Sequence, residues 1–385
     1  MTRTHERPKV AILGSTYGTI NQKVRELLEL LDYRPVKEKI FIKPNLTSTF
    51  SPRTGIITSP RIIEALIMYV RDGYPERKIV VGDGCATGAS FGDVFRISGY
   101  GYLVKKYGIE VVDLDGVDRA DVRWKYGALR LPELLGTHEY INVAKMKTNA
   151  TTVATLAMKN QKGLLERKMK RSFHVKMDLH DAIRELCAVV RPDLSIIDGM
   201  PALEGNGPTV MGTSKRMNVI MASDNLYAID NAALKIMGIE VSKVRHIPAF
   251  DDYTTVGEPL EKFIQPFRLP DPSPWNVGRL YIHFSDAICS QCDMNLQRTT
   301  LPSFGDPSSL AFLSRYIASG SFLKRIDILS GAAADVPASA KKPLCYGNCL
   351  RPLAAKHGLP IVEGCPPEVD AGRKAILDFL RGGSR

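Results

Sequence analysis

The chain of 385 residues contains no apolar run that approaches the roughly 18 residues needed to span a membrane. Its first nine residues are polar and charged, and no apolar segment follows them as one would in a secretory signal peptide. These two absences exclude the membrane-spanning and the secreted classes. They predict a protein of the cytoplasm with no membrane partner.

Cysteine is scarce, and its number is odd, since the chain has seven. Without a signal peptide, an odd count argues against a disulfide framework and favours reduced thiols that bind metal or pack in a core. Cys187 lies among apolar residues of a predicted helix at 178–190 and is predicted to be a packed thiol. Five of the other cysteines fall in the last hundred residues, which favours a metal site there.

The chain also lacks the pattern of a nucleic-acid-binding protein. Lys and Arg outnumber Asp and Glu by 52 to 41, a formal net charge of +11, but the basic residues are scattered. The densest basic run, at 166–171, is short and has no set of aromatic residues for base stacking. The positive charge therefore favours an acidic partner or an anionic small-molecule substrate, and we expect no nucleic-acid partner.

Strand and helix patterns alternate through the first two thirds of the chain. Short apolar runs predict buried strands, and the amphipathic stretches between them predict helices. Strands are predicted at 9–13, 37–44, 78–82, 109–114, 139–143, 194–197 and 218–222, and helices at 21–31, 60–71, 178–190 and 225–237. This order predicts an α/β fold with a doubly wound, mostly parallel sheet.

A proline-rich segment interrupts this pattern. Five prolines fall between residues 259 and 277, which is typical of a connector. The sequence therefore predicts an α/β domain at 1–257, a connector at 258–277 and a smaller, cysteine-rich α/β subdomain at 278–385. The cysteines of this subdomain follow predicted strands, and loops at the carboxyl edge of a parallel sheet lie close together.

The C-terminal cysteines are spaced as candidate ligands of a metal cluster. Cys289 and Cys292 form a C-x₂-C pair, and Cys349 and Cys365 lie in glycine-containing turns that let the backbone approach a cluster. We predict these four as ligands of a [4Fe-4S] cluster, with Cys345 as the competitor for the position of Cys349. Structural zinc is the alternative, because it takes the same thiolates.

Three lysine-bearing segments adjoin predicted strand ends and indicate an anion-binding pocket. Lysine is a compact charge suited to carboxylates or phosphates, and a neighbouring asparagine adds a donor and an acceptor. We therefore predict a substrate-binding set of Lys43, Asn45, Lys145, Lys147, Lys159 and Asn160. The alternative is that these are solvated surface lysines beside turn-forming asparagines.

Two acidic residues and a histidine near these segments are candidates for proton transfer. Asp198 ends a predicted strand, Glu204 follows it, and His180 lies at the start of a predicted helix. Carboxylates and imidazoles are common general acids and bases, so we predict these three residues as catalytic. The alternatives are a structural histidine, and carboxylates that orient the lysines or hold a divalent ion.

An ordered set of short motifs runs through residues 8–240. The motifs are Lys43-Pro44-Asn45, Thr58-Ser59-Pro60, Val81-Gly82-Asp83-Gly84, Lys145-Met146-Lys147, Lys159-Asn160-Gln161-Lys162-Gly163, Asp198-Gly199, Glu204-Gly205-Asn206-Gly207-Pro208 and Ala222-Ser223-Asp224. In this set the chain resembles the DUF362 family, a group of iron-sulfur-associated proteins of uncharacterised function. The resemblance implies an α/β domain that often occurs with cysteine-rich iron-sulfur segments. The C-terminal part departs from the C-x₂-C-x₂-C-x₃-C-P runs of many relatives.

Together these features predict a cytoplasmic [4Fe-4S] oxidoreductase that reduces a small anionic molecule held by lysines, with a redox protein as electron donor. A non-catalytic iron-sulfur carrier or assembly partner is one alternative. An open-iron dehydratase or lyase is another, if only three cysteines bind the cluster. With zinc in place of iron, the chain would be a binding module.

Overall fold

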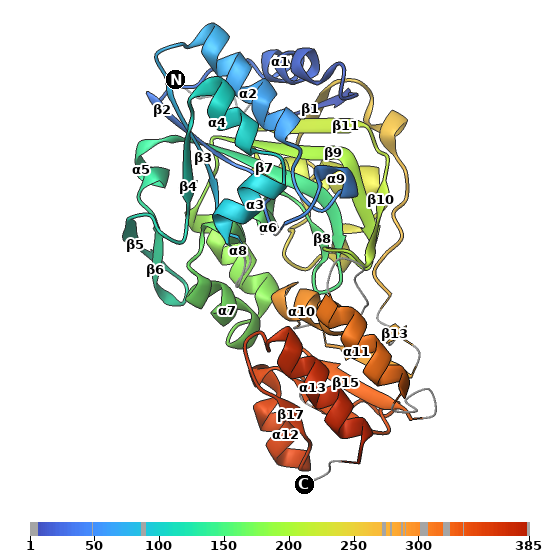
Figure 1. Cartoon of the computed structure of the whole chain (residues 1–385). Helices are drawn as coiled ribbons and strands as arrows, with labels where there is room; N and C mark the ends of the chain where they lie inside the picture. Colours follow the sequence, from blue (N-terminus) through green and yellow to red (C-terminus); the bar gives the residue numbers. More distant parts are fainter. Residues whose placement is uncertain are drawn as a thin grey trace. The chain divides into compact units, whose positions relative to one another are not determined.

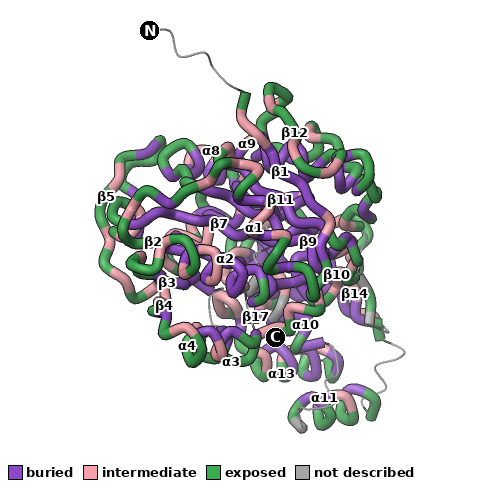
Figure 2. Tube along the Cα trace, turned by 90° about the horizontal axis from the view of Figure 1, so that it is seen from above, coloured by how far each residue is buried: buried purple, intermediate pink, exposed green. Residues whose placement is uncertain are grey.

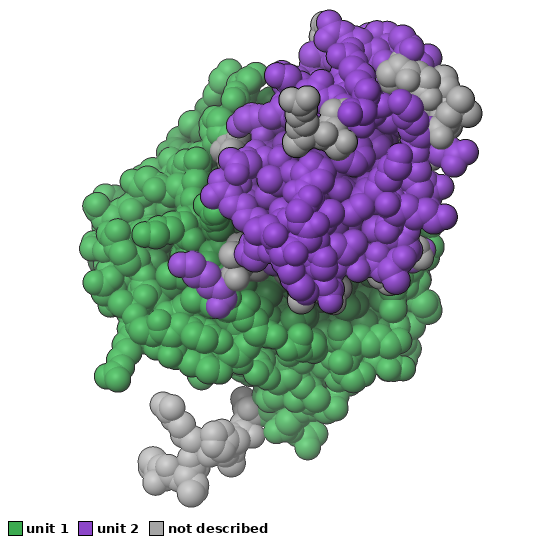
Figure 3. Space-filling view, turned by 90° about the horizontal axis from the view of Figure 1, so that it is seen from below, with its two compact units in different colours: residues 1–173, 177–270 green, residues 174–176, 271–385 purple. Residues whose placement is uncertain are grey.

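The computed structural model describes most of the chain as two compact units (Figures 1 and 3). The described residues are 7–47, 49–85, 90–271, 275–277, 279–285, 288, 290–300, 307–318, 324–333 and 335–382. The first unit comprises residues 1–173 and 177–270, and the second comprises 174–176 and 271–385. The division at residue 270 falls inside the proline-rich segment 258–277, and Leu260, Phe263 and Phe267 of that segment are buried in the core of the first unit.

The first unit is built on a ten-stranded sheet. Its main path has the order β12-β1-β11-β9-β7-β2-β3-β4, with β10 paired to β9 and β8 paired to β7. From β9 to β4 the neighbours run parallel, whereas β11 runs antiparallel to both its neighbours. The expected α/β fold with a mostly parallel sheet is confirmed. The strands are β1 Lys9–Gly14, β2 Lys39–Lys43, β3 Lys78–Asp83, β4 Glu110–Asp113, β7 Glu139–Asn149, β8 Val153–Thr155, β9 Leu194–Gly205, β10 Gly212–Lys215, β11 Val219–Ser223 and β12 Thr254–Gly257.

Side chains of this sheet alternate between two apolar cores, one on each face. On β2, Ile40 and Ile42 belong to one core and Phe41 belongs to the other. The first core includes residues of α1 Ile20–Leu30, α2 Pro60–Gly73, α3 Phe91–Ile97 and α4 Gly101–Tyr107, and the second includes residues of α6 Ala157–Asn160, α8 Leu179–Val189 and α9 Leu226–Met237. A sheet covered on both faces needs buried side chains on both sides, so β7 and β9 are buried along almost their whole length (Figure 2).

Several of the described helices begin where the sequence supplies a capping side chain. Ser59 precedes α2, Asp178 precedes α8 and Asn225 precedes α9, and each side chain accepts a backbone N–H of the first turn. Pro60 occupies the first turn of α2, where its missing N–H is not needed. The predicted helix starts at 60 and 225 are therefore confirmed to within one residue.

Two central strands extend well beyond their predicted ends. β7 continues to Asn149 rather than residue 143, and β9 continues to Gly205 rather than residue 197. Each extension pairs with an antiparallel partner, β8 or β10, which satisfies its backbone groups. Apolar periodicity does not reveal such polar extensions. Lys145, Lys147 and Asp198 therefore lie within strands and not in loops.

The other elements up to residue 270 are short. They are β5 Arg119–Trp124 and β6 Gly127–Pro132, which pair with each other, α5 Leu134–Thr137, α7 Arg167–Val175, and the 3₁₀ turns η1 Pro52–Thr54, η2 Gln161–Leu164, η3 Val241–Lys243 and η4 Leu260–Phe263. The helix α2, with 14 residues, is the longest in the described ranges. None of the helices described is long and apolar enough to cross a membrane.

The second unit has its own five-stranded sheet, ordered β13-β14-β15-β16-β17. Strands β14 to β17 are parallel, and β13 is antiparallel to β14. One face packs against residues of α10, α11 and α13, and the other packs against residues of α12. The elements are β13 Trp275–Val277, β14 Leu280–Phe284, α10 Ser290–Thr300, α11 Pro307–Ala318, β15 Ile326–Ser330, β16 Pro343–Tyr346, η6 Asn348–Leu350, α12 Arg351–His357, β17 Ile361–Val362 and α13 Val369–Leu380.

Glu64 of α2 connects this helix to α4 in the first unit. Its carboxylate, 2% exposed, accepts hydrogen bonds from the hydroxyls of Tyr102 and Tyr107 at 2.9 Å, from Lys106 Nζ at 2.8 Å and from Arg61 at 2.9 Å. Burial alone would raise the pKa of Glu64, but these four bonds outweigh it and lower the pKa to about 2.

We expect Glu64→Gln to lower the free energy of unfolding by roughly 2 kcal/mol at pH 7, because an amide cannot accept from all four donors. On unfolding, the pKa of Glu64 rises from about 2 to its ordinary 4.5, so its contribution is complete above pH 4.5 and is lost as the pH falls toward 2. Urea unfolding at pH 7 and pH 3 measures the difference, with exposed Glu38→Gln as the control. A difference of the same size at both pH values would contradict this role.

Candidate functional site

The lysines of the N-terminal motifs gather at one edge of the first sheet. Strands β2, β7 and β9 are parallel neighbours, so their carboxyl ends meet at this edge. Lys43 ends β2, and Lys145 and Lys147 lie on the extended end of β7. These three side chains are at most 1% exposed. The alternative of solvated surface lysines is therefore wrong for them.

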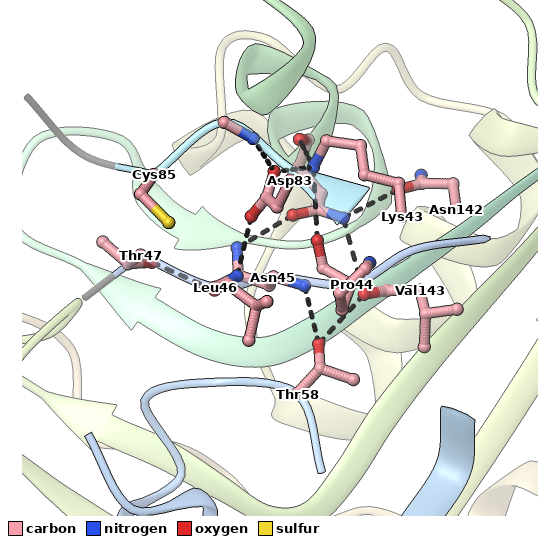
Figure 4. A network of polar contacts seen from close by, with 12 residues as sticks. Lys43, Pro44, Asn45, Leu46, Thr47, Thr58, Asp83, Cys85, Asn142 and Val143 are labelled. Atoms are coloured by element: carbon pink, nitrogen blue, oxygen red, sulfur yellow. Dashed lines mark hydrogen bonds and ion pairs between the residues drawn. The ribbon is translucent and has the colours of Figure 1, made fainter. Parts of the chain in front are cut away.

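Lys43 is neutralised by a carboxylate that was not among the predicted site residues. Its Nζ lies 2.9 Å from Asp83 Oδ1 and donates to the backbone carbonyl of Asn160 at 2.7 Å (Figure 4). Asp83, at the end of β3, also accepts the backbone N–H groups of Leu46 and Gly84 at 2.7 and 2.9 Å. This one carboxylate therefore holds the ends of two strands and the loops that follow them.

Gly163 is required by its close approach to this ion pair. A Cβ at this position would lie 2.2 Å from Asp83 Oδ1 and 2.6 Å from Lys43 Nζ. Any side chain larger than hydrogen would displace one of the two charged groups. This contact explains the glycine that ends the motif at 159–163.

Three asparagines link the same strands through their side chains. Asn45 Nδ2 donates to Asn160 Oδ1, and Asn160 Nδ2 donates to Asn142 Oδ1, each at 2.8 Å. Asn142 Nδ2 in turn donates to the backbone carbonyl of Ala157 at 3.0 Å. Buried amides need such partners for both donor and acceptor atoms. The two predicted asparagines, Asn45 and Asn160, are therefore engaged within the protein.

Lys145 and Asp198 form a second ion pair, and both side chains are 0% exposed. Lys145 Nζ lies 2.8 Å from Asp198 Oδ2, although without the angle of a directed hydrogen bond. Asp198 also accepts the backbone N–H groups of Ser59 and Met200 at 2.8 and 2.7 Å. Burial lowers the pKa of Lys145, and the charge of Asp198 opposes that shift. The geometry makes Asp198 a charge partner and an anchor for two loops, and its catalytic role stays a prediction.

Lys147 is buried with no carboxylate in ion-pair contact among the residues that the structure describes. Its Nζ donates to Asn45 Oδ1 at 2.9 Å and to the backbone carbonyl of Ile56 at 2.7 Å. Burial and the charges of two neighbouring lysines lower the pKa of Lys147 to about 7, although Asp83 acts in the opposite direction. Within the described residues, Lys147 is thus held by neutral oxygens and has no carboxylate as a direct counterion.

Lys159 lies on α6, a short helix that is anchored by a buried carboxylate. Asp230 of α9 is 0% exposed and accepts the backbone N–H groups of Ala157 and Met158 at 2.8 and 2.9 Å. Burial raises the pKa of Asp230 to about 7, and these two bonds oppose the rise. Lys159 is half-buried and donates to the hydroxyl of Thr152. Burial and the charges of neighbouring lysines hold the pKa of Lys159 well below its ordinary value.

His180, a predicted catalytic residue, forms a pair with His246. The two Nδ1 atoms lie 3.2 Å apart, so one ring donates a hydrogen bond to the other. His246 is 0% exposed, and its Nε2 has no hydrogen-bond partner within the described residues. Burial holds the pKa of His246 well below its usual range, and the charge of Lys159 adds to this effect.

The sheet edge with Lys43, Lys145, Lys147 and Lys159 is called the lysine edge below. Glu204 has its partners outside it. Its carboxylate accepts Lys215 Nζ at 3.1 Å and both the backbone N–H and the Nε of Arg268, at 3.1 and 2.9 Å. Burial would raise the pKa of Glu204, but these bonds outweigh it and lower the pKa. The carboxylate connects the β9–β10 hairpin to the chain after η4, and its predicted catalytic role stays a prediction.

Three residues of this edge were not predicted from the sequence. The sequence could have indicated Asp83, because it follows a predicted strand and belongs to the motif Val81-Gly82-Asp83-Gly84. Asn142 lies inside an apolar strand, and His246 lies in a loop 66 positions after His180. No local pattern marks either of them, since their roles arise from contacts between distant segments.

In the second unit, three cysteine-bearing segments meet around Gly347. The Sγ atoms of Cys292, on α10, and of Cys349 each lie 3.7 Å from the place where a Cβ of Gly347 would be. Gly347 has a φ of 107°, which favours glycine, and its missing side chain leaves room beside both sulfur atoms. The backbone of residue 348 donates at 2.9 Å to the carbonyl of residue 364, next to Cys365.

Cys345 belongs to an apolar cluster against which Cys349 also packs. It is 0% exposed on β16 and packs with Leu329, Leu350 and Leu353, whereas Tyr346 belongs to the opposite core. The predicted ligand Cys289 lies outside the described residues. No disulfide joins any two of the six described cysteines, and no group of three described His, Cys, Asp or Glu residues is arranged to hold a single metal ion. Cys187 is buried, as predicted.

Residues 40–235 match the profile of a family described as a domain of unknown function, DUF362. The chain belongs to the DUF362 family. It is 29% identical over 238 residues to a protein of Synechocystis sp. (strain PCC 6803) named thylakoid-associated protein sll1697, and the match covers 59% of this chain and 73% of that protein. The DUF362 region contains the lysine edge from Lys43 to Asp230, whereas the C-terminal cysteines lie beyond it.

The buried charge of Lys147 gives this DUF362 protein a testable pH dependence. The pKa of Lys147 is about 7 in the folded chain and 10.5 ordinarily, so between these values the unfolded chain binds more protons. Wild-type stability should therefore rise with pH relative to Lys147→Met, by about 2 kcal/mol from pH 7 to pH 9. Urea unfolding of both proteins measures this difference.

The exposed Lys105→Met on α4 is the matched control and should show a constant offset from wild type over the same range. A constant offset for Lys147→Met as well would mean that Lys147 keeps its ordinary pKa in the folded protein.

Proposed function

We propose that this DUF362 protein binds a [4Fe-4S] cluster through Cys289, Cys292, Cys349 and Cys365 and acts in the cytoplasm as an oxidoreductase on a small anionic molecule. The observation that carries the proposal is the approach of two cysteine sulfur atoms to the same glycine, Gly347. A third cysteine follows a residue hydrogen-bonded to that loop. Three cysteine-bearing segments thus come together within one unit, which supports the proposal because a thiolate-bound cluster draws its ligands from such segments.

The local chemistry at these cysteines suits a metal–thiolate site. Cys292 lies in the first turn of α10, where the partial positive charge of the helix end favours a thiolate. Pro366 and Pro367 follow Cys365, and Gly347 lets a bulky group approach the two sulfur atoms. Soft thiolates select iron-sulfur clusters or zinc. The chain resembles a family of iron-sulfur-associated proteins, and this resemblance favours iron. When bound by four thiolates, such a cluster accepts and donates single electrons.

Cys349 suits the third ligand position better than Cys345 does. Cys345 is fully buried among leucines, so a ligand there would have to disrupt the apolar packing of β16 against α12. Cys349 is only half-buried and lies beside Gly347.

The lysine edge of the first unit would supply the charge that holds the anion. Lys43 and Lys145 are each paired with an aspartate, so we assign them to the framework of the site. Lys147 and Lys159 have only neutral oxygens as recorded partners, and they would attract the anion. The imidazoles of His180 and its partner would carry the proton that accompanies a reduction.

A reducing compartment is part of this proposal. The cytosol keeps thiols reduced and therefore available as ligands. The name of the relative from Synechocystis places that protein at thylakoids, and for this chain we propose the cytoplasm because no described helix is suited to span a membrane.

Anaerobically purified protein should contain about four irons and four acid-labile sulfides per chain, the content of one [4Fe-4S] cluster. Cys292→Ser and Cys349→Ser should lose the visible absorption of the cluster, because each removes one of its thiolates. Iron and sulfide assays, with electron paramagnetic resonance before and after dithionite, measure both effects. An S = 1/2 signal after reduction would support electron transfer.

Cys345→Ala is the matched control for Cys349→Ser, since the two cysteines lie four positions apart, on β16 and η6, and only one is proposed as a ligand. It should keep the full iron content. Loss of the cluster in Cys345→Ala together with its retention in Cys349→Ser would reverse the ligand assignment, and zinc without iron in the wild type would overturn the redox function.

A further inference from the structure

We propose that the first unit binds a small oxyanion carrying two negative charges, a phosphate group or a dicarboxylate, through Lys147, Lys159 and His246. The inference specifies the chemical class of the anionic substrate in the proposed function. Only the identification of this anion as the substrate rests on that function. It also adds His246 and the hydroxyl of Thr155 to the binding groups. All of these residues belong to the first unit, so the site needs nothing from the second.

The formal charges at the lysine edge do not balance. Lys43 and Lys145 are each paired with an aspartate, Asp83 or Asp198. Lys147 and Lys159 have no carboxylate in ion-pair contact within the described residues. The third carboxylate nearby, Asp230, binds the amides of α6 and is not among the groups that shift the pKa of Lys147 or Lys159. Burial without a counter-charge shifts both of these lysines toward the neutral form. A bound dianion would instead favour the charged form of both.

The buried atoms without a hydrogen-bond partner in the described ranges include one on Thr155, opposite Lys147, and one on His246, whose pKa is lowered by the charge of Lys159. Thr155 is 4% exposed and stands directly opposite Lys147 in the β7–β8 pair, so their Cβ atoms are about 5 Å apart. Its Oγ1 has no recorded partner, and neither has Nε2 of the fully buried His246. Buried polar atoms are nearly always hydrogen-bonded, so two exceptions beside unbalanced charges indicate an absent ligand.

The histidine pair prepares His246 Nε2 to donate to an anion. A hydrogen bond between two Nδ1 atoms needs one protonated and one bare nitrogen. Burial and the charges of Lys159, His180 and Lys162 keep His246 neutral, so it carries one N–H. With His180 as the donor to Nδ1 of His246, that N–H lies on Nε2. His180 is then a positioning residue that sets the tautomer of His246.

The donors that remain suit an oxyanion better than any other ligand class. Lys159 uses one of its three N–H groups on Thr152 and has two more. His246 and Thr155 can each add one donor. A carboxylate or phosphate accepts several hydrogen bonds at once, whereas a metal ion would be repelled by the lysines and a neutral ligand would leave their charges unbalanced.

Isothermal titration calorimetry of the full chain at pH 7 tests the site, with inorganic phosphate and malonate as separate probes. We expect at least one probe to bind the wild type and Lys159→Met to weaken that binding at least tenfold. His246→Asn should also weaken it, because the shorter amide does not reach the position of Nε2. The probe that binds more tightly, phosphate or malonate, shows whether the site prefers a phosphate group or a dicarboxylate.

Lys159→Arg and Lys105→Met are the two controls. The arginine variant keeps the charge and should recover most of the affinity, which separates lost binding from lost folding, and the exposed Lys105→Met should match the wild type. Failure of both probes to bind the wild type, or equal weakening in Lys105→Met, would overturn the inference. Iron is assayed in the same samples, so a normal iron content without anion binding rejects this site alone, and anion binding without iron rejects the cluster alone.

Discussion

The first unit depends on the burial of lysine ammonium groups at the ends of neighbouring parallel strands. An ammonium taken out of water costs several kcal/mol unless a counter-charge and hydrogen bonds replace its hydration. Asp83 and Asp198 meet this need for Lys43 and Lys145, and each also accepts two backbone N–H groups of nearby loops. The strands, the loops that follow them and the close approach of Gly163 are therefore constrained by the same two carboxylates.

This arrangement divides chemically similar lysines into two groups. Lys43 and Lys145 are neutralised inside the protein, so they give the edge its shape without attracting a ligand. The described partners of Lys147 and Lys159 are neutral oxygens, and burial lowers the pKa of both lysines. The two ion pairs fix the shape of the edge beside the two lysines that lack a carboxylate partner among the described residues. A rigid surrounding of this kind holds binding groups in place before a ligand arrives.

The two units differ in what each contributes to the proposed chemistry. The DUF362 match covers the lysines of the edge, and the proposed ligand cysteines lie in a separate unit with its own sheet and its own apolar cores. In that second unit the turn at Gly347 matters most, since its positive φ and missing side chain bring the loop of Cys349 beside Cys292. Anion binding and metal binding can therefore be tested independently of each other.

The sequence by itself determined the α/β class, the helix starts at 60 and 225 and the positions of the lysines near strand ends, because apolar periodicity and capping side chains act over a few residues. Only the tertiary structure decided which lysines acquire a counter-charge, since Lys43 meets Asp83 across 40 positions and Lys145 meets Asp198 across 53. It also decided that Cys345 faces leucines and that His180 meets His246. Those outcomes depend on strand phase and on contacts between distant segments, which no local pattern of residues encodes.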